Sequence, residues 1–369
     1  MRSTPRILSL HMSMAASYWQ ERFESGVQDA ADIQKEFQDM MRGIQMYLAH
    51  DYERLDDHLS VIHEDGAARI LRYEAHDYGG GKPVLLLIPS LINKAHIFDL
   101  TERRSMLRYF CEQGVDAYLL DWGDFLDDDQ MQNLDGVVLS RLRGCIAALA
   151  ESAGVKIHAL GYCMGGSLLA GLAAIDDAHL KSLTFMATPW DFHSGSQEML
   201  NRVKFWTPSL MNSLKEDGAL KVDWLQILFS SLYPEQAMKK FARFSQMDLN
   251  SDDARIFVAV EDWLNDGVPL PVGVGQAAVK EWFLSNAPAT RSWKLDGENV
   301  DAKQIKLPSL VVASSKDRLV EYDSAIVLHE CINNATICDP KCGHVGMIAG
   351  TNAIENVWQP IANWVFKNA

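Results

Sequence analysis

The sequence predicts an α/β fold: a mostly parallel, doubly wound sheet into which a mainly helical cap is inserted. Three observations support this prediction. Short apolar runs, typical of buried strands, alternate with segments rich in helix formers. One of these runs passes through a sharp, glycine-bounded turn directly into a helix-forming segment. The length of 369 residues is long for one compact domain and suits a core with a large insertion.

The chain divides into three predicted regions. Residues 1–64 form an N-terminal helical region, because apolar residues recur at three- and four-residue steps within a helical pattern over residues 12–60. Residues 65–190 and 301–369 form the α/β core, and residues 191–300 form the cap. The cap is rich in aromatic residues and methionine, so we expect it to cover the reactive site, exclude water and line an acyl tunnel.

The most informative motif is the sequence Gly-Tyr-Cys-Met-Gly-Gly at residues 161–166. It joins a strand-like run to a helix-forming segment, and glycines flank Cys163 because side chains there would clash between strand and helix. The amino end of the helix favours the thiolate, the reactive form of cysteine. The motif predicts that Cys163 forms a covalent acyl intermediate. A buried structural cysteine beside a glycine-rich turn is the simpler alternative.

An acid and a base follow this turn in the order expected for such a nucleophile. Asp317 comes just after the apolar run 307–313, and His344 follows the run 335–339. The two residues are 27 positions apart, which leaves room for one helix and one strand. We predict that His344 activates Cys163 and that Asp317 orients the imidazole and stabilises its charged form.

The other histidines have simpler interpretations. We expect His158, inside the run before the turn, to be a core or sheet-face residue. Surface or capping positions are expected for five more: His58, His63, His76, His179 and His329.

An oxyanion hole needs backbone N–H donors at the reacting carbonyl oxygen. Met164, the residue after the nucleophile, is the first predicted donor. The second is expected from the loop 90–94, which follows the apolar run 83–89. Leu91 is the predicted donor in this loop, and Ser90 is the close alternative.

Together these motifs resemble the polyhydroxyalkanoate synthase family of the α/β-hydrolase superfamily, particularly its short, class III/IV-like catalytic subunits. The resemblance rests on the turn and on further segments that occur in family order between about residues 70 and 365. These segments are residues 86–94, 97–100, 117–123, 186–192, 316–317 and 343–346.

The resemblance implies an α/β-hydrolase fold and an acyltransferase that polymerises 3-hydroxyacyl-coenzyme A into polyhydroxyalkanoate and releases coenzyme A. Cys163 would carry the polyester as a thioester, His344 would activate Cys163, and Asp317 would also help to activate the substrate hydroxyl. Coenzyme A enters only as part of the substrate, and no metal or redox cofactor is implied. The implied partners are the acyl-coenzyme A and the polyester chain, with a second synthase subunit or a homodimer as a further option.

Two other functions stay open. A cysteine-dependent acyl hydrolase, either a thioesterase or an esterase of the dienelactone-hydrolase type, would use the same turn. A non-catalytic protein that binds polyester granules or a synthase would keep the fold without turnover. The complete set of Cys163, Asp317 and His344 counts against this last alternative.

Composition limits the partners and the location. Hydrophobic residues make up 48% of the chain and charged residues 22%, which predicts a large core. The net charge of −15 argues against nucleic acid as a partner. No apolar run reaches the roughly eighteen residues of a transmembrane helix, and no convincing secretion signal is present. The six cysteines lack metal-ligand spacing, so we expect reduced thiols in the cytoplasm, with the surface of polyester granules as a further location.

An anionic coenzyme A substrate would need a local basic patch on this acidic chain. One candidate cluster contains Arg103, Arg104 and Arg108, and a second contains Arg141 and Arg143. Ordinary solvated helix faces are the simpler interpretation, which we prefer from the sequence alone.

Overall fold

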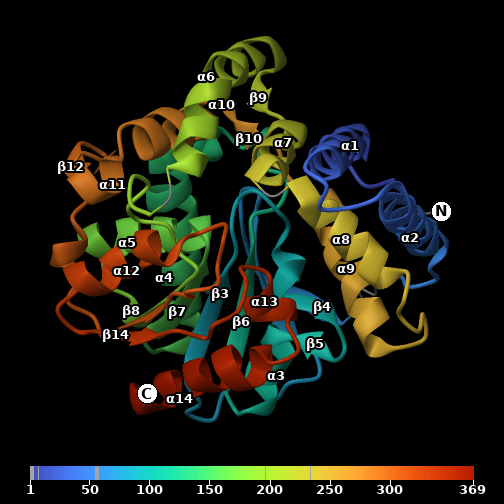
Figure 1. The fold of residues 1–369 in the computed structure, drawn as a ribbon. Coiled ribbons are helices and arrows are strands. Elements are labelled where there is room, and N and C mark those ends of the chain that lie inside the picture. Colours follow the sequence, from blue (N-terminus) through green and yellow to red (C-terminus); the bar gives the residue numbers. More distant parts are fainter. Residues whose placement is uncertain (1–3, 7, 55–57, 196, 233) are drawn as a thin grey trace. The chain divides into compact units, whose positions relative to one another are not determined.

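The computed structural model describes residues 4–6, 8–54, 58–195, 197–232 and 234–369 (Figure 1). The chain forms two compact units, and each is assembled from two segments that are distant in sequence. Unit 1 combines Met1–Arg54 with Val222–Gly267, and unit 2 combines Leu55–Lys221 with Val268–Ala369. The division into residues 1–64, a core and a cap over 191–300 stays a prediction.

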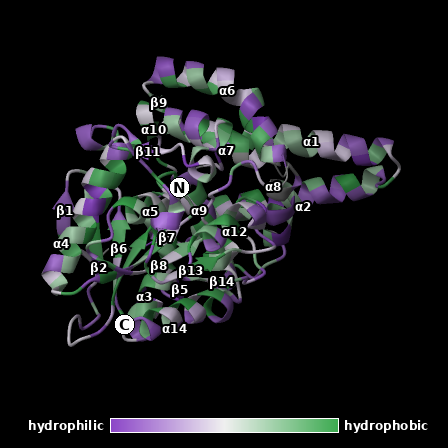
Figure 2. Cartoon of the chain, turned by 90° about the vertical axis from the view of Figure 1, so that its left-hand side faces the viewer, coloured by the Kyte–Doolittle hydropathy of each residue, from purple (hydrophilic) through white to green (hydrophobic). Residues whose placement is uncertain are grey.

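Unit 2 is built around an eight-stranded sheet with the order β1-β2-β6-β3-β7-β8-β13-β14. The two contacts of β2 are antiparallel and all other neighbours are parallel, which confirms the predicted mostly parallel sheet. Figure 2 shows the central strands of this sheet as largely hydrophobic, as expected for strands covered on both faces. Their bounds are Leu59–Asp65 (β1), Ala68–Tyr73 (β2), Val84–Ile88 (β3), Asp116–Asp121 (β6), Ile157–Tyr162 (β7), Leu180–Met186 (β8), Ser309–Val312 (β13) and Ala335–Cys338 (β14).

Helices cover this sheet. α3 (Met106–Glu112) packs on β6, α5 (Met164–Ile175) on β7 and β8, and α12 (Tyr322–Cys331) on β13 and β14. α3 begins only at Met106. The strands β4 (Asp99–Thr101) and β5 (Arg104–Ser105) precede it, and the Ser105 side chain caps its first turn.

Between β6 and β7 the chain forms a π-helical segment η3 (Gly136–Leu142) that continues directly into α4 (Arg143–Ala153). The remaining elements of unit 2 are η1 (Ala95–Phe98), η2 (Asp129–Met131), α6 (Glu198–Asp217), β9 (Ala219–Leu220), β10 (Leu270–Pro271), α10 (Val272–Gln276), η4 (Ala277–Leu284), α11 (Ala287–Thr290), β11 (Lys294–Leu295), β12 (Glu298–Asn299), η5 (Ala302–Gln304), α13 (Gly346–Ala349), η6 (Ile354–Trp358) and α14 (Gln359–Lys367).

Unit 1 is helical. Its elements are α1 (Leu8–Glu24), α2 (Ala30–Ala49), α7 (Val222–Leu232), α8 (Pro234–Phe244) and α9 (Asp252–Asn265). The continuous helical pattern predicted over residues 12–60 is wrong in its extent. The first helix ends at the end of α1. Asp29 then caps α2 by accepting hydrogen bonds from the N–H groups of Ala31 and Asp32, both at 2.9 Å.

A shared apolar core joins the two sequence segments of unit 1. Gly43 in α2 allows α8 to approach closely, because a Cβ atom there would lie 1.9 Å from the carbonyl oxygen of Phe241. The core residues are Ala15, Trp19, Met40, Ile44, Tyr47, Met238, Phe241, Phe244, Ala254 and Val258. Within the described ranges of both units, no helix is long and apolar enough to cross a bilayer.

Candidate active site

Cys163 lies in the turn between β7 and α5, where the sequence predicts it. Its φ of 55° and ψ of −127° are a strained backbone conformation for a residue with a side chain. Its N–H donates to the carbonyl of Met186 at 2.9 Å, which holds the turn against the end of β8. The turn therefore presents the Cys163 sulfur at the carboxyl edge of the sheet.

Two glycines allow the close backbone approach that this turn needs. A Cβ atom at Gly161 would lie 2.5 Å from the Cα atom of Gly166. One at Gly165 would lie 2.4 Å from the carbonyl oxygen of Pro89. Real Cβ contacts are longer than this, so a side chain at either position would force the backbone to move. Gly165 thereby allows the loop after β3 to rest against the first turn of α5.

His344 and Asp317 form a buried pair. Nδ1 of His344 lies 2.8 Å from Oδ2 of Asp317, and their side chains are only 9% and 0% exposed. The other carboxylate oxygen of Asp317 accepts the N–H groups of Leu319 at 2.8 Å and Val320 at 3.0 Å. These bonds fix the carboxylate, which in turn fixes the orientation of the imidazole.

Ser314 ties the loop that carries Asp317 to the loop that carries His344. Its hydroxyl donates to the carbonyl of Cys342 at 2.6 Å and accepts the Cys342 N–H at 2.9 Å. The two loops follow β13 and β14, which are parallel neighbours. The acid and the base therefore arrive together at one edge of the sheet.

The Cys163 side chain lies near enough to His344 to act on its charge, and Nδ1 of His344 is already taken by Asp317. Burial alone would lower the pKa of His344. The negative charge of Asp317, its hydrogen bond to the imidazole and the interaction with the Cys163 sulfur outweigh burial and raise that pKa to about 10. His344 is therefore protonated at neutral pH beside the sulfur.

Tyr162 is a site residue that the sequence analysis missed. Its ring lies over His344 with the centroids 5.0 Å apart, and its hydroxyl donates to the His344 carbonyl at 3.4 Å. The available signal was its position directly before the predicted nucleophile, although a strand residue at that position is also expected to pack in the core.

The surroundings of the predicted oxyanion donors can be described, although their role stays a prediction. Met164 begins α5, where N–H groups have no acceptor within the helix. Leu91 is buried in the loop after β3, which Gly165 brings against that first turn. Trp122 donates from Nε1 to the carbonyl of Pro89 at 3.1 Å, at the start of this loop.

The prediction for His158 is confirmed, because this residue is 1% exposed and its Nδ1 lies 2.7 Å from the Ser182 hydroxyl. The surface or capping positions predicted for His58 and His76 are wrong. Nε2 of His58 lies 2.5 Å from Asp99. Nε2 of His76 lies 2.9 Å from Asp116. Both carboxylates are buried and need such partners.

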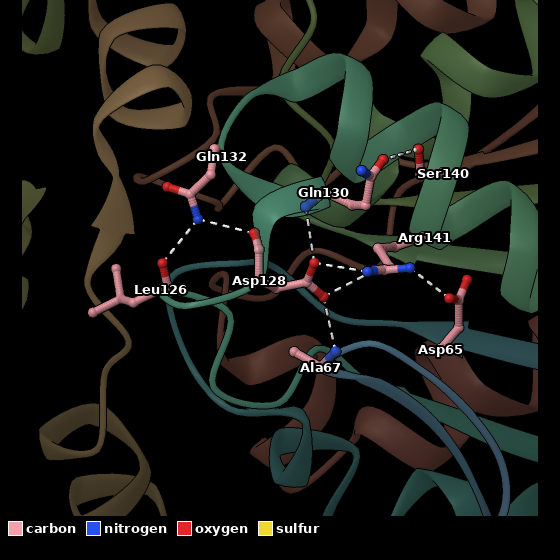
Figure 3. A network of polar contacts seen from close by, with 8 residues as sticks. All are labelled: Asp65, Ala67, Leu126, Asp128, Gln130, Gln132, Ser140 and Arg141. Carbon is pink, nitrogen blue, oxygen red and sulfur yellow. Dashed lines mark hydrogen bonds and ion pairs between the residues drawn. The ribbon is translucent and has the colours of Figure 1, made fainter.

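Arg108 and Arg141, one from each basic cluster, are not on solvated helix faces as we preferred from the sequence. Their side chains are only 15% and 14% exposed. Arg108 pairs with Asp99, with 3.3 Å between Nε and Oδ1. Arg141 holds Asp128 through two nitrogens at 2.7 and 2.9 Å and reaches Asp65 at 2.5 Å (Figure 3). The Arg141 guanidinium is thus engaged by protein carboxylates.

The other cysteines differ from Cys163 in their surroundings. Burial raises the pKa of each of these thiols, to about 12 for Cys145 and to about 11 for Cys342, so they are weak nucleophiles at neutral pH. The remaining three are Cys111, Cys331 and Cys338. Among the residues that the structure describes, no three His, Cys, Asp or Glu side chains are grouped so that they could hold a metal ion.

The model of the α/β hydrolase fold family matches residues 83–351. The chain therefore belongs to this family, as the sequence predicts. A solved structure with the same fold is the thermostable carboxyl esterase of Bacillus coagulans. It is 14% identical, covers 84% of this chain and 98% of its own, and has a TM-score of 0.54. At this identity the likeness shows the fold alone.

The more particular likeness is to curated polyhydroxyalkanoate polymerases. Poly(3-hydroxyalkanoate) polymerase subunit PhaC of Haloferax mediterranei is 24% identical over 82% of this chain, and the match spans only 63% of the relative's length. The protein of the same name from Haloarcula marismortui is 25% identical over 95% of this chain and 75% of its own. The predicted resemblance is confirmed, and these relatives are acyl-transferring enzymes.

Proposed function

We propose that this chain is an acyltransferase that polymerises 3-hydroxyacyl-coenzyme A into polyhydroxyalkanoate through a thioester on Cys163. One observation carries the proposal: Cys163 lies on a strained turn beside a charged His344 that Asp317 holds in place. The names of the curated relatives support the substrate class. They also describe a subunit, which supports a second synthase subunit as a partner, and a homodimer is the alternative.

In the first step the Cys163 sulfur attacks the carbonyl carbon of the substrate thioester. A bond forms between this sulfur and the carbonyl carbon, and the carbonyl π electrons move to oxygen, where the N–H groups of Met164 and Leu91 would stabilise the charge. When the tetrahedral intermediate collapses, the bond to the coenzyme A sulfur breaks. His344 gives its proton to that leaving thiolate, so the products are acyl-Cys163 and coenzyme A.

In the second step a hydroxyl group of another 3-hydroxyacyl unit attacks acyl-Cys163. An ester bond forms, the bond to the Cys163 sulfur breaks, and the now neutral His344 takes the hydroxyl proton. The resemblance gives Asp317 a part in activating this hydroxyl. Both of its carboxylate oxygens are already hydrogen-bonded within the protein, so we propose that Asp317 acts on the hydroxyl through His344.

The test is coenzyme A release from 3-hydroxybutyryl-coenzyme A, with the product sized, for the wild type and Cys163→Ala. The proposal expects polyester and coenzyme A from the wild type and a loss of about 10⁴-fold or more in the variant. Release that gives only free hydroxy acid would instead show an acyl hydrolase. Equal release from both proteins would rule out Cys163 as the nucleophile.

Iodoacetamide labelling distinguishes an enzyme from the non-catalytic alternative. An enzyme with an activated Cys163 is alkylated there much faster than at its five other thiols, whose pKa values are raised by burial. Slow, unselective labelling without turnover would favour a protein that only binds granules or a synthase. A cytoplasmic location at the granule surface is part of the proposal, because the polyester product is apolar.

A further inference from the structure

One buried indole holds the loop that contains the predicted oxyanion donor. Trp122 directly follows β6, is 3% exposed, and donates from Nε1 to the carbonyl oxygen of Pro89 at 3.1 Å. We propose that Trp122 is a positioning residue for acyl transfer: it orients residues 89–92, the oxyanion loop, against the turn that carries Cys163. This inference rests on the acyl-transfer chemistry of the proposed function, although not on the identity of the acyl group.

The hydrogen bond from Trp122 fixes the direction in which the first peptide of the oxyanion loop points. In a trans peptide the carbonyl oxygen and the N–H of the next residue lie in one plane and point in opposite directions. The structure contains no cis peptide among its described residues, so fixing the Pro89 carbonyl also fixes the direction of the Ser90 N–H. It further constrains the path of the chain into Leu91. Leu91 is the predicted donor of this loop, and Ser90 is its alternative.

Gly165 allows a short distance between the start of the oxyanion loop and the first turn of α5. A Cβ atom on Gly165 would lie 2.4 Å from the carbonyl oxygen of Pro89 and 2.6 Å from that of Ile88. The start of the oxyanion loop therefore touches the first turn of α5, next to Met164, the other predicted donor. Trp122 and Gly165 together determine how the two donors face one another.

The far end of the oxyanion loop is also held. The Ile92 carbonyl accepts the N–H of Val268 at 2.8 Å, and the Ile92 N–H donates to the Ser90 hydroxyl at 3.3 Å. With Pro89 and Ile92 both bonded, little backbone freedom is left for the residues between them. The indole bond is then the contact that sets the orientation of the first peptide.

The chain around Trp122 is itself rigid. The next residue, Gly123, has a φ of 66° and lies so close to Ala67 that a Cβ atom would be 2.1 Å from the Ala67 carbonyl oxygen. Further along the same loop, Asp128 accepts the Ala67 N–H at 2.8 Å and is held by Arg141 (Figure 3). The indole therefore projects from a loop that is anchored to the turn between β1 and β2.

Two reagents distinguish a positioning role from general damage. Acylation of Cys163 by p-nitrophenyl acetate forms a sulfur–carbonyl bond, places charge on the carbonyl oxygen, and expels p-nitrophenolate. Alkylation by iodoacetamide forms a sulfur–methylene bond and expels iodide, and it places no charge on a carbonyl oxygen. Only the first reaction needs an oxyanion hole, so loss of loop orientation should slow acylation selectively.

The experiment measures both rate constants in the wild type, Trp122→Phe and Trp358→Phe. Trp358 is the matched control, because its indole is 1% exposed and also donates to a backbone carbonyl, that of Met347, at 3.1 Å. We expect Trp122→Phe to lower the acylation rate about 10- to 100-fold. Its alkylation rate should stay within about twofold of wild type, since the thiolate is untouched. In Trp358→Phe the ratio of the two rates should be unchanged.

The inference would be overturned by an unchanged ratio in Trp122→Phe, which includes an equal fall of both rates, or by the same selective loss in Trp358→Phe. If Trp122→Phe does not fold, 3-benzothienylalanine at position 122 keeps the bicycle and replaces the N–H by sulfur, with the same expected loss. Neither reagent contains coenzyme A or a 3-hydroxyacyl group. A selective loss therefore supports the inference even if the wild type makes no polymer, whereas a wild type that is alkylated but never acylated contradicts it.

Discussion

Two histidine–aspartate pairs in unit 2 have almost the same geometry. Nδ1 of His344 lies 2.8 Å from Asp317, and the side chains are 9% and 0% exposed. Nε2 of His76 lies 2.9 Å from Asp116, and the side chains are 9% and 4% exposed. Distance and burial therefore do not separate a candidate catalytic pair from a structural one.

The surroundings separate the two pairs. Asp116 is the first residue of β6, so it lies at the amino end of a strand, and the other oxygen of its carboxylate accepts the Gly79 N–H at 2.6 Å. The edge of the Tyr78 ring packs against the His76 ring, at 4.5 Å between centroids. At the opposite edge of the sheet, His344 lies beside Cys163, the predicted nucleophile on its strained turn. A His–Asp pair in this fold is therefore distinguished by the third group beside it and by the edge of the sheet on which it lies.

The largest expected effect comes from exchanging each histidine for glutamine. His344→Gln should lower kcat/KM by about 10⁴-fold or more, because it removes the group that gives and takes the proton. His76→Gln should leave kcat/KM within about twofold and lower the free energy of unfolding by about 1–3 kcal/mol. Steady-state kinetics and urea unfolding of both variants check this. A large loss of activity in His76→Gln without unfolding would contradict a purely structural role of the His76–Asp116 pair.

The aspartates should show the same contrast on a smaller scale. Asp317→Asn keeps the shape but weakens the support of the charged imidazole, so kcat/KM should fall on the order of 10²- to 10⁴-fold. Asp116→Asn should destabilise the fold and leave turnover nearly unchanged. Equal kinetic effects of the two substitutions would show that Asp317 has no special role.

The stability of the fold should depend on the charge of His344. The pKa of His344 is raised to about 10 in the folded protein, above the ordinary value of 6.5. Protonation of His344 therefore stabilises the fold: the contribution is complete below about pH 6.5 and is lost as the pH rises towards 10. The free energy of unfolding of the wild type, relative to His344→Gln, should fall across this window by an amount on the order of 1–4 kcal/mol.

Urea unfolding between pH 6.5 and 10 measures this difference. The variant His76→Gln is the control and should keep the decline, since its His344 is intact. A free-energy difference between wild type and His344→Gln that does not change with pH would contradict a charged His344 at neutral pH.

The smallest expected effect concerns Tyr162. Tyr162→Phe removes a long hydrogen bond of 3.4 Å to the His344 carbonyl and keeps the ring over the imidazole. We expect kcat/KM to change by no more than about threefold, because a bond of this length contributes little. A loss above about tenfold would show that the Tyr162 hydroxyl contributes to the reaction.

The sequence predicted those parts of the site that lie next to a strand end. Cys163, Asp317 and His344 each follow a recognisable apolar run, and parallel strands bring their carboxyl ends to one edge. The structure brings all three together. The contact between Trp122 and Pro89 joins two such strand ends, but the sequence does not show which way an indole points. His58 and His76 were misjudged for the same reason, since their buried partners lie about 40 positions away.

The helices of unit 1 show a different limit. The break between α1 and α2 has local signals, Gly26 with a φ of 70° and the cap Asp29, which a longer apolar periodicity obscured. Their partners α8 and α9 could not be inferred, because an amphipathic stripe indicates that a helix packs on something without indicating on what.

The discontinuous make-up of unit 1 has a consequence for synthesis. About 170 residues separate Arg54 from Val222, so at about 5–20 residues per second a ribosome needs roughly 10–30 seconds to supply the second half of this unit. During that time Trp19, Ile44 and Tyr47 have been translated, whereas the helices that bury them have not. Until α9 emerges from the ribosome, the apolar faces of α1 and α2 lack their partners. A chaperone would be expected to bind to these two helices.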